Sequence, residues 1–195
     1  HIGSYLIHNL YKIKKVKNIY LIDNNSNNKI STLFNLKIKN KKIYFIYDDL
    51  MQPKKFFKIK NIQVLIHLAS ITNAQNSIER KNFYQKNNLG CFNNVLKYCI
   101  SNKTKLIHIS STSIYGDQSK IVNEDSKFLK PQSPYAEIKL KEEKILKKYS
   151  KKINFISLRF GTIAGVLRGM RFHTVVNKFC LNTILNENVP VWKTA

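Results

Sequence analysis

The sequence has few acidic residues, with 11 Asp and Glu against 34 Lys and Arg, which gives a formal net charge of +23. Arginine is also scarce, and nearly all of the positive charge comes from scattered lysines. A surface that reads nucleic acid usually relies on arginine for bidentate contacts to phosphates and bases. The charge, with the abundant Asn and Ile, is typical of AT-rich coding sequence, so we do not expect nucleic-acid binding.

Cysteine is another residue that the chain has little of. Cys91, Cys99 and Cys180 form no CxxC pair, and an odd number argues against a disulfide framework or a zinc site. We therefore predict reduced thiols, no metal site and a cytoplasmic location. No stretch approaches the ~18 consecutive apolar residues of a membrane helix. The first residues also lack the basic start and apolar run of a signal peptide, so we predict no membrane association.

Short apolar segments alternate with longer segments of helical periodicity along the chain. The predicted strands cover residues 17–23, 42–48, 63–69, 105–111 and 154–160. The predicted helices cover residues 2–13, 79–101, 134–150 and 172–185. Buried strands separated by helices favour parallel pairing, so we predict an α/β fold with a doubly wound parallel sheet.

The beginning of this pattern is unusual for such a fold. A doubly wound dinucleotide fold begins with a strand, a glycine-rich turn and then the first helix. Here a helix opens at residue 2, and Gly3 stands where the last glycine of that turn would be. We therefore expect a Rossmann-like sheet that lacks its first strand, over residues 1–162. Residues 163–195, with a less regular pattern, are expected to begin a smaller lobe.

One pattern could carry catalysis, the YxxxK from Tyr135 to Lys139. By itself the pattern is weak, since Tyr11 to Lys15 also matches. The second match opens a predicted helix and follows a strand that ends at Ser111. Residues i and i+4 share a helix face, so the charge of Lys139 could stabilise the Tyr135 phenolate and lower its pKa. Ser111 could hold the same substrate hydroxyl. The alternative is a surface Tyr and Lys beside a turn Ser.

Further segments stand in a fixed order around this trio. They are His1–Ser4, Asp23, Asp49–Leu50, His67–Ser70 (HLAS), Asn87–Gly90 (NxxG), Ser110–Gly116 (SSxxxYG), Ser133–Tyr135 with Lys139 (SPYxxxK), and Leu158–Gly161. In this order and spacing the chain resembles the extended short-chain dehydrogenase/reductases, the NAD-dependent epimerase/dehydratase family, and among them the nucleotide-sugar epimerases. The resemblance runs along nearly the whole chain.

The resemblance implies an NAD-binding domain over residues 1–162 and the beginning of a substrate-binding region over residues 163–195, truncated at either end. The residues it assigns to NAD are Ile2, Gly3, Asp23, Asn24, Asp49, Leu50, Leu68, Ala69, Ser70, Asn87, Ser110, Tyr135 and Lys139. Asp23 favours NAD over NADP, because a carboxylate accepts from a ribose 2′-hydroxyl and repels a 2′-phosphate. The alternative for Asp23 is a generic loop acid.

The activity implied by the resemblance is NAD-dependent epimerisation of a nucleotide sugar through a transient keto intermediate, by a homodimer. Ser111, Tyr135 and Lys139 would be catalytic. The substrate would contact Ser111, Thr112, Thr162 and Arg171. Thr162 stands where galactose epimerases carry Asn, and Arg171 with Arg168 could hold a diphosphate or be surface arginines.

Two groups of alternatives stay open at this point. One is a sugar reductase or dehydratase of the same family. Dehydratases carry Asp-Glu after the catalytic hydroxyl, whereas this chain has Thr112 and Ser113, which favours epimerisation. The other alternative is a non-catalytic Rossmann-like protein that binds RNA through its positive charge, and an intact Ser111, Tyr135 and Lys139 argues against it.

Overall fold

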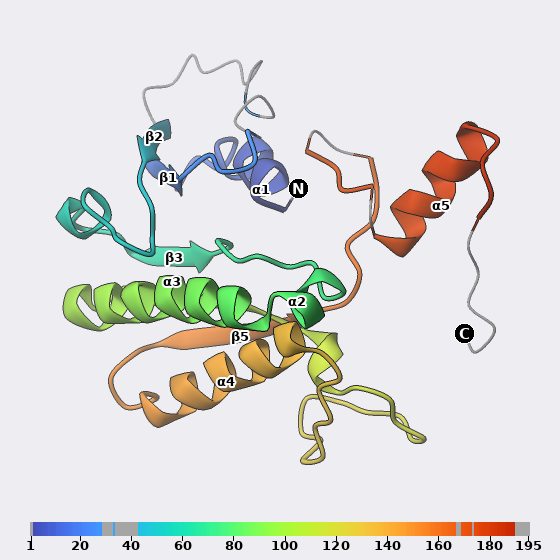
Figure 1. Cartoon of the computed structure of the whole chain (residues 1–195). Helices are drawn as coiled ribbons and strands as arrows, with labels where there is room; N and C mark the ends of the chain where they lie inside the picture. The colour runs from blue at the N-terminus through green and yellow to red at the C-terminus, as the bar shows by residue number, and fades with distance from the viewer. Residues whose placement is uncertain (1, 29–32, 34–42, 167–168, 173, 190–195) are drawn as a thin grey trace. The chain divides into compact units, whose positions relative to one another are not determined.

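A computed structural model describes residues 2–28, 33, 43–166, 169–172 and 174–189. The described residues fall into two compact units, which are treated separately (Figure 1). Unit 1 contains the described part of residues 1–20, 25–44 and 162–195, and unit 2 contains residues 21–24 and 45–161. The expected functional boundary after residue 162 stays a prediction.

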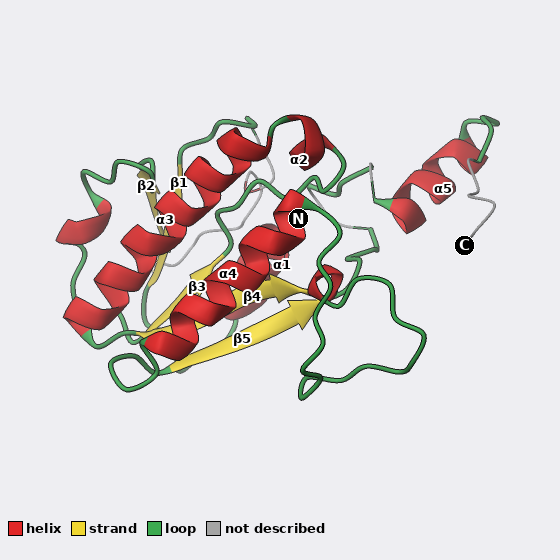
Figure 2. Cartoon of the chain, turned by 60° about the horizontal axis from the view of Figure 1, so that its bottom comes forward, coloured by secondary structure: helices red, strands yellow, loops and turns green. Residues whose placement is uncertain are grey.

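The sheet of unit 2 has the strand order β3-β4-β5, with β3 at Val64–His67, β4 at Lys105–Ser111 and β5 at Phe155–Phe160. Both pairings are parallel. Helices α3 (Lys81–Asn102) and α4 (Pro134–Lys148) lie side by side over one face of this sheet (Figure 2). Parallel strands joined through covering helices confirm the predicted α/β class.

The hydrophobic core of unit 2 lies mainly between that sheet face and the two helices. Its buried members are Phe56, Phe92, Val95, Leu96, Tyr98, Cys99, Leu106, Leu146 and Ile153. Alternate residues of β4 point into it, because successive strand side chains face opposite sides of a sheet. Cys91 and Cys99 are buried, and burial raises the pKa of the two thiols to about 11 and about 12.

The two remaining strands, β1 (Ile19–Asp23) and β2 (Ile43–Tyr47), form a separate two-stranded sheet. In the doubly wound order 3-2-1-4-5-6, the first strand separates the second from the fourth. The described strands supply every position of this order except the first. They are therefore expected to form two separate sheets, as observed here. The break agrees with the expected Rossmann-like sheet without its first strand.

Several helices differ from their predicted ranges. The helix predicted over residues 79–101 is α3, which begins two residues later, and a short helix that was not predicted, α2 (Asn76–Glu79), precedes it across a non-helical backbone conformation at Arg80. Helix α1 (Ile2–Leu10) ends three residues early, and α5 covers Val175–Ile184. Helices fray at their ends, so differences of this size are expected.

Two short 3-10 helices, η2 (Phe56–Lys58) and η3 (Thr112–Ile114), were not predicted. The buried carboxylate of Asp48 accepts hydrogen bonds from the backbone N–H groups of Lys54, Lys55 and Phe56, and so fixes the turn into η2. Burial alone would raise the pKa of Asp48, but these backbone donors hold it below its usual value.

Gly116, two residues after the end of η3, offers a first test of the fold. Its φ of +65° lies in the left-handed region, and an added Cβ would collide with the backbone carbonyl oxygen of Lys130. We expect Gly116→Ala to lower the free energy of unfolding by about 2 kcal/mol, measured by chemical denaturation. Gly161→Ala is the matched control, because its added Cβ would have Thr112 Oγ1 as its nearest contact at 3.9 Å. Equal losses in the two variants would contradict this account.

Candidate active site

The first turn of α4 is fixed by side chains that precede and surround it. Ser133 caps the helix, with its Oγ accepting from the backbone N–H of Ala136 at 3.2 Å, and Pro134 occupies the first turn. The backbone N–H of Tyr135 donates to the Oγ of the buried Ser77 at 3.2 Å. The backbone that carries Tyr135 is therefore held both by its own helix and by α2.

Ser111 is the last residue of β4, at the carboxyl end of the central strand of this sheet. Its Oγ accepts from the backbone N–H of Ser113 at 3.2 Å and lies 2.8 Å from the Ser113 Oγ. Helix α4 packs against both β4 and η3. A helix that follows a parallel strand runs back along the sheet, so its first turn lies at the strand ends, beside Ser111.

Lys139 follows Tyr135 by four residues and lies on the same face of α4. Its Nζ is 5.9 Å from the centroid of the Tyr135 ring, and its side chain is buried. The predicted pairing of an amine with a phenol is therefore present. Because α4 packs on β4 and on η3, which follows Ser111, the three predicted catalytic residues belong to elements that pack together in unit 2.

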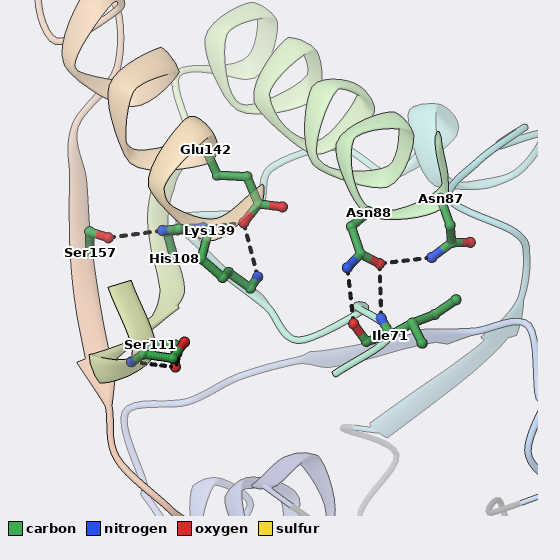
Figure 3. A network of polar contacts seen from close by, with 9 residues as sticks. Ile71, Asn87, Asn88, His108, Ser111, Lys139, Glu142 and Ser157 are labelled. Atoms are coloured by element: carbon green, nitrogen blue, oxygen red, sulfur yellow. Dashed lines mark hydrogen bonds and ion pairs between the residues drawn. The ribbon is translucent and has the colours of Figure 1, made fainter. Parts of the chain in front are cut away.

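The Lys139 amine also belongs to a buried polar network that was not predicted (Figure 3). Its Nζ donates to Glu142 Oε2 at 2.9 Å, and His108 Nε2 lies 2.9 Å from the same oxygen. His108 Nδ1 is 2.9 Å from Ser157 Oγ. Burial acts to raise the pKa of Glu142, but Lys139 and His108 outweigh it, so the carboxylate is charged and its pKa lies below the usual value.

His67, at the end of β3, is buried and neutral. Burial, followed by the charge of Lys139, lowers the pKa of His67 from 6.5 to about 3. Between these pH values the unfolded chain binds the proton and the folded chain does not, so stability is complete above about pH 6.5 and is lost as the pH falls.

This linkage predicts an acid-sensitive stability that His67→Leu removes. We expect the free energy of unfolding of the unmodified protein to fall by about 1.5 kcal/mol from pH 6.5 to pH 5 through His67 alone. The variant should show a correspondingly flatter dependence in denaturant titrations over that range. Parallel pH profiles for the two proteins would show that His67 is already protonated in the folded state.

A second group of predicted residues gathers at the carboxyl ends of β1 and β2. The Nδ2 of Asn24 donates to Asp49 Oδ2 at 3.4 Å, and Asp49 Oδ1 accepts from the backbone N–H of Met51 at 2.8 Å. The backbone N–H of Asp48 donates to the carbonyl of Asp23 at 3.2 Å, which places Asp23 beside the same turn. Doubly wound sheets bind ligands at the carboxyl ends of their strands.

The segment after β3 contains Leu68, Ala69 and Ser70, and it is anchored to α3. The buried Asn88 donates to the carbonyl of Ile71 at 3.0 Å and accepts from the Ile71 N–H at 2.9 Å. Asn87, the predicted residue of the NxxG motif, donates to Asn88 Oδ1 at 3.0 Å instead. The Oγ of Ser70 is buried without a hydrogen-bond partner among the described residues, which fits a ligand-facing position.

The other predicted site residues have less support. Ser110 is 2% exposed, and its Oγ, like that of Ser70, is buried without a hydrogen-bond partner among the described residues. Thr112 is exposed, and its Oγ1 donates to the Phe160 carbonyl at 3.4 Å. The remaining residues, Ile2, Gly3, Thr162 and Arg171, belong to unit 1, and Arg168 lies outside the described residues.

The family assignment follows from a model of sequence families. The description of the matching model is "NAD dependent epimerase/dehydratase family", and the match covers residues 1–195. The chain belongs to this family. Among the described residues, no helix is both long and apolar enough to cross a membrane.

Individual members of the family are only moderately similar to the chain. The uncharacterized UDP-glucose epimerase YtcB of Bacillus subtilis is 30% identical over 190 residues, which cover 91% of this chain and 58% of that protein. A UDP-glucose 4-epimerase of Yersinia enterocolitica is 28% identical over 156 residues, 77% of this chain and 46% of the relative. The chain therefore spans about half the length of these curated relatives.

A solved structure gives the same fold. UDP-glucuronic acid 4-epimerase from Bacillus cereus, in complex with UDP-glucuronic acid and NAD, is 27% identical to this chain. The TM-score is 0.82, and the match covers 98% of this chain and 62% of that one. The Rossmann-like fold predicted from the sequence is thereby confirmed for this member of the family.

Proposed function

We propose that this protein epimerises a nucleotide sugar with NAD as its cofactor. The observation that carries the proposal is the position of Lys139, which is buried on the Tyr135 face of α4 with Nζ 5.9 Å from the ring centroid. A positive charge beside a phenol favours the phenolate, the form that can remove a proton from a sugar hydroxyl. The alternative interpretation was a Tyr and a Lys on the protein surface. It does not explain why the Lys139 amine is buried.

Each residue of the trio has one task in this proposal. Tyr135 removes the proton from the substrate hydroxyl and later returns it. Ser111, at the end of the central strand, holds that hydroxyl in place. Lys139 supplies the positive charge that stabilises the phenolate. Water is kept from the amine by burial, which strengthens its effect on the phenol.

The residues around the trio fit NAD. The unpartnered Ser70 Oγ and the strand-end group of Asp23, Asn24 and Asp49 would contact the cofactor, with Asp23 selecting NAD over NADP. Ile2 and Gly3 would face the pyrophosphate from the first turn of α1. When bound, NAD supplies a reversible acceptor for the hydride of the sugar carbon.

Epimerisation is favoured over dehydration by the side chains that follow Ser111. Thr112 and Ser113 carry no carboxyl group that could act as the acid for loss of water. The names of the relatives support a uridine-diphosphate sugar, as in UDP-glucose or UDP-glucuronic acid. Thr162 and Arg171 would contact this substrate. The homodimer and the cytoplasmic location stay predictions from the sequence.

The test is an assay of the intact protein without added cofactor. We expect NAD to be released when the purified protein is denatured. We also expect UDP-glucose or UDP-glucuronic acid to be converted to its 4-epimer, and proton NMR measures this conversion. Turnover that requires added reduced cofactor in stoichiometric amounts would assign a reductase instead. Absent turnover, with RNA retained on the protein at high salt, would favour the non-catalytic RNA-binding alternative.

A further inference from the structure

We infer that Glu142 is a positioning residue for the catalytic amine: it holds Lys139 beneath Tyr135, and His108 holds Glu142. This inference rests on the proposed function, since that function gives Lys139 its task. The hydrogen bonds described for Glu142 are those with Lys139 and His108 (Figure 3), so its effect on Tyr135 would pass through Lys139.

The first support is the burial of the ion pair. The side chains of Lys139 and Glu142 are 4% and 0% exposed, and their Nζ and Oε2 atoms are 2.9 Å apart. A buried ammonium is costly unless a counter-charge lies in direct contact with it. Because the two residues are three apart on α4, the carboxylate lies on the same helix face as the amine. Glu142 therefore fixes both the charge and the direction of the Lys139 side chain.

The second support is that the carboxylate is also held by the sheet. His108 of β4 contacts Glu142 Oε2 at 2.9 Å, and its other ring nitrogen contacts Ser157 of β5 at 2.9 Å. Strand β4 ends at Ser111. The network therefore ties the amine on α4 to the strand that carries the catalytic hydroxyl, and a shift of the helix against the sheet would disturb both together.

The third support is that the two carboxylate oxygens of Glu142 are unequally hydrogen-bonded. Oε2 of Glu142 receives both contacts, while Oε1 is buried with no hydrogen-bond partner among the described residues. The groups that face the carboxylate are Lys139 on its own helix, His108 on β4 and His67 on β3. A half-satisfied buried carboxylate lowers stability, which is a cost that functional sites commonly carry.

The direction of the effect on Tyr135 separates this role from a direct one. If Glu142 acted on the phenol through its own negative charge, removing that charge would let Tyr135 ionise at lower pH. If it acts by holding Lys139, removing it leaves a buried ammonium without its counter-charge, so the amine moves away or loses its proton. Tyr135 would then ionise at higher pH, by about one unit.

The experiment is a titration of the Tyr135 phenol in the intact protein without substrate. Tyrosine labelled with carbon-13 at Cζ reports ionisation by NMR, and the Tyr135 signal is the one missing from Tyr135→Phe. We expect Glu142→Gln to move the midpoint upward by about one pH unit. Glu137→Gln is the matched control, since this carboxylate on α4 is half exposed and pairs with Lys81 and not with Lys139. Its midpoint should stay unchanged. An unchanged or lower midpoint in Glu142→Gln overturns the inference.

A second comparison covers the case in which Glu142→Gln does not fold. Glu142→Asp keeps a counter-charge for the buried amine, so it is expected to fold where Glu142→Gln does not. Its carboxylate is one carbon shorter and would lie farther from Lys139 Nζ, so the Tyr135 midpoint should move upward, by less than in Glu142→Gln. A midpoint in Glu142→Asp that stays unchanged or falls overturns the inference. Since no substrate is present, this result is independent of whether the protein proves to be an epimerase.

Discussion

Tyr135→Phe is expected to lower kcat for epimerisation by about 1,000-fold, because general acid–base catalysis by a positioned side chain contributes about 10² to 10⁴. The phenol is the proton acceptor of the proposed reaction, and Phe keeps the ring while removing the hydroxyl. The backbone N–H of Tyr135 and its bond to Ser77 remain, so the helix start should be unaffected. The measurement is the initial rate of 4-epimer formation with the bound NAD quantified in each preparation.

Tyr11→Phe is the control for this variant. Tyr11 heads the other YxxxK match of the chain, but it lies just beyond the end of α1 and not at the carboxyl end of a strand. Its rate should stay within about twofold of the unmodified protein, as for a surface substitution away from a site. Retention of full activity in Tyr135→Phe would remove the proposed chemistry, even if NAD were still bound.

The sequence predicts those parts of the site that depend on local spacing. Tyr135 and Lys139 share one helix, so the i,i+4 rule places them on one face before any packing is known. The strand that ends at Ser111 was predicted with its observed bounds, because its apolar residues lie between a turn and a polar segment. The relation of that strand to α4 follows from the alternation of strands and helices.

Contacts between distant segments escape this kind of prediction. His108 and Glu142 are 34 residues apart, and they meet only because α4 packs on β4 with a particular rotation. Alternation along β4 places His108 on the covered face of the sheet but could not reveal its partner. The same limit applies to Asn88, because the motif indicates Asn87 whereas packing makes Asn88 the residue that anchors Ile71.

The helix break at Arg80 has a similar origin. The sequence there has no Gly or Pro, and the predicted helix begins at residue 79, so neither α2 nor the break that follows it was predicted. In the structure, α2 contacts both α3 and α4, and its buried Ser77 binds the backbone of Tyr135. Tertiary contacts of α2 thus outweigh the local preference to continue the helix. A buried Ser in a polar segment was the available signal, and it is too common to be decisive.

The largest expected loss of stability comes from breaking the pair between Glu143 and Arg159. Arg159 donates to both carboxylate oxygens, at 3.0 Å and 2.8 Å, and the two side chains are only 7% and 12% exposed. Arg159 also donates to the Tyr115 hydroxyl oxygen at 2.9 Å and to the Glu124 carbonyl at 3.2 Å. Glu143→Ala should lower the free energy of unfolding by about 3 kcal/mol, because it leaves a buried guanidinium without its counter-charge.

The pH dependence and a double variant make this prediction specific. Burial acts to raise the pKa of Glu143, but Arg159 holds it below its usual value, so the stabilisation is present above about pH 4.5 and is lost as the pH falls through the folded-state value. The difference between Glu143→Ala and the unmodified protein, measured by denaturant unfolding, should therefore shrink in acid. Adding Arg159→Met should recover much of the loss, since no buried charge then remains. A loss that is equal at pH 7 and pH 3, or is unaffected by Arg159→Met, would mean that packing and not the ion pair accounts for the effect.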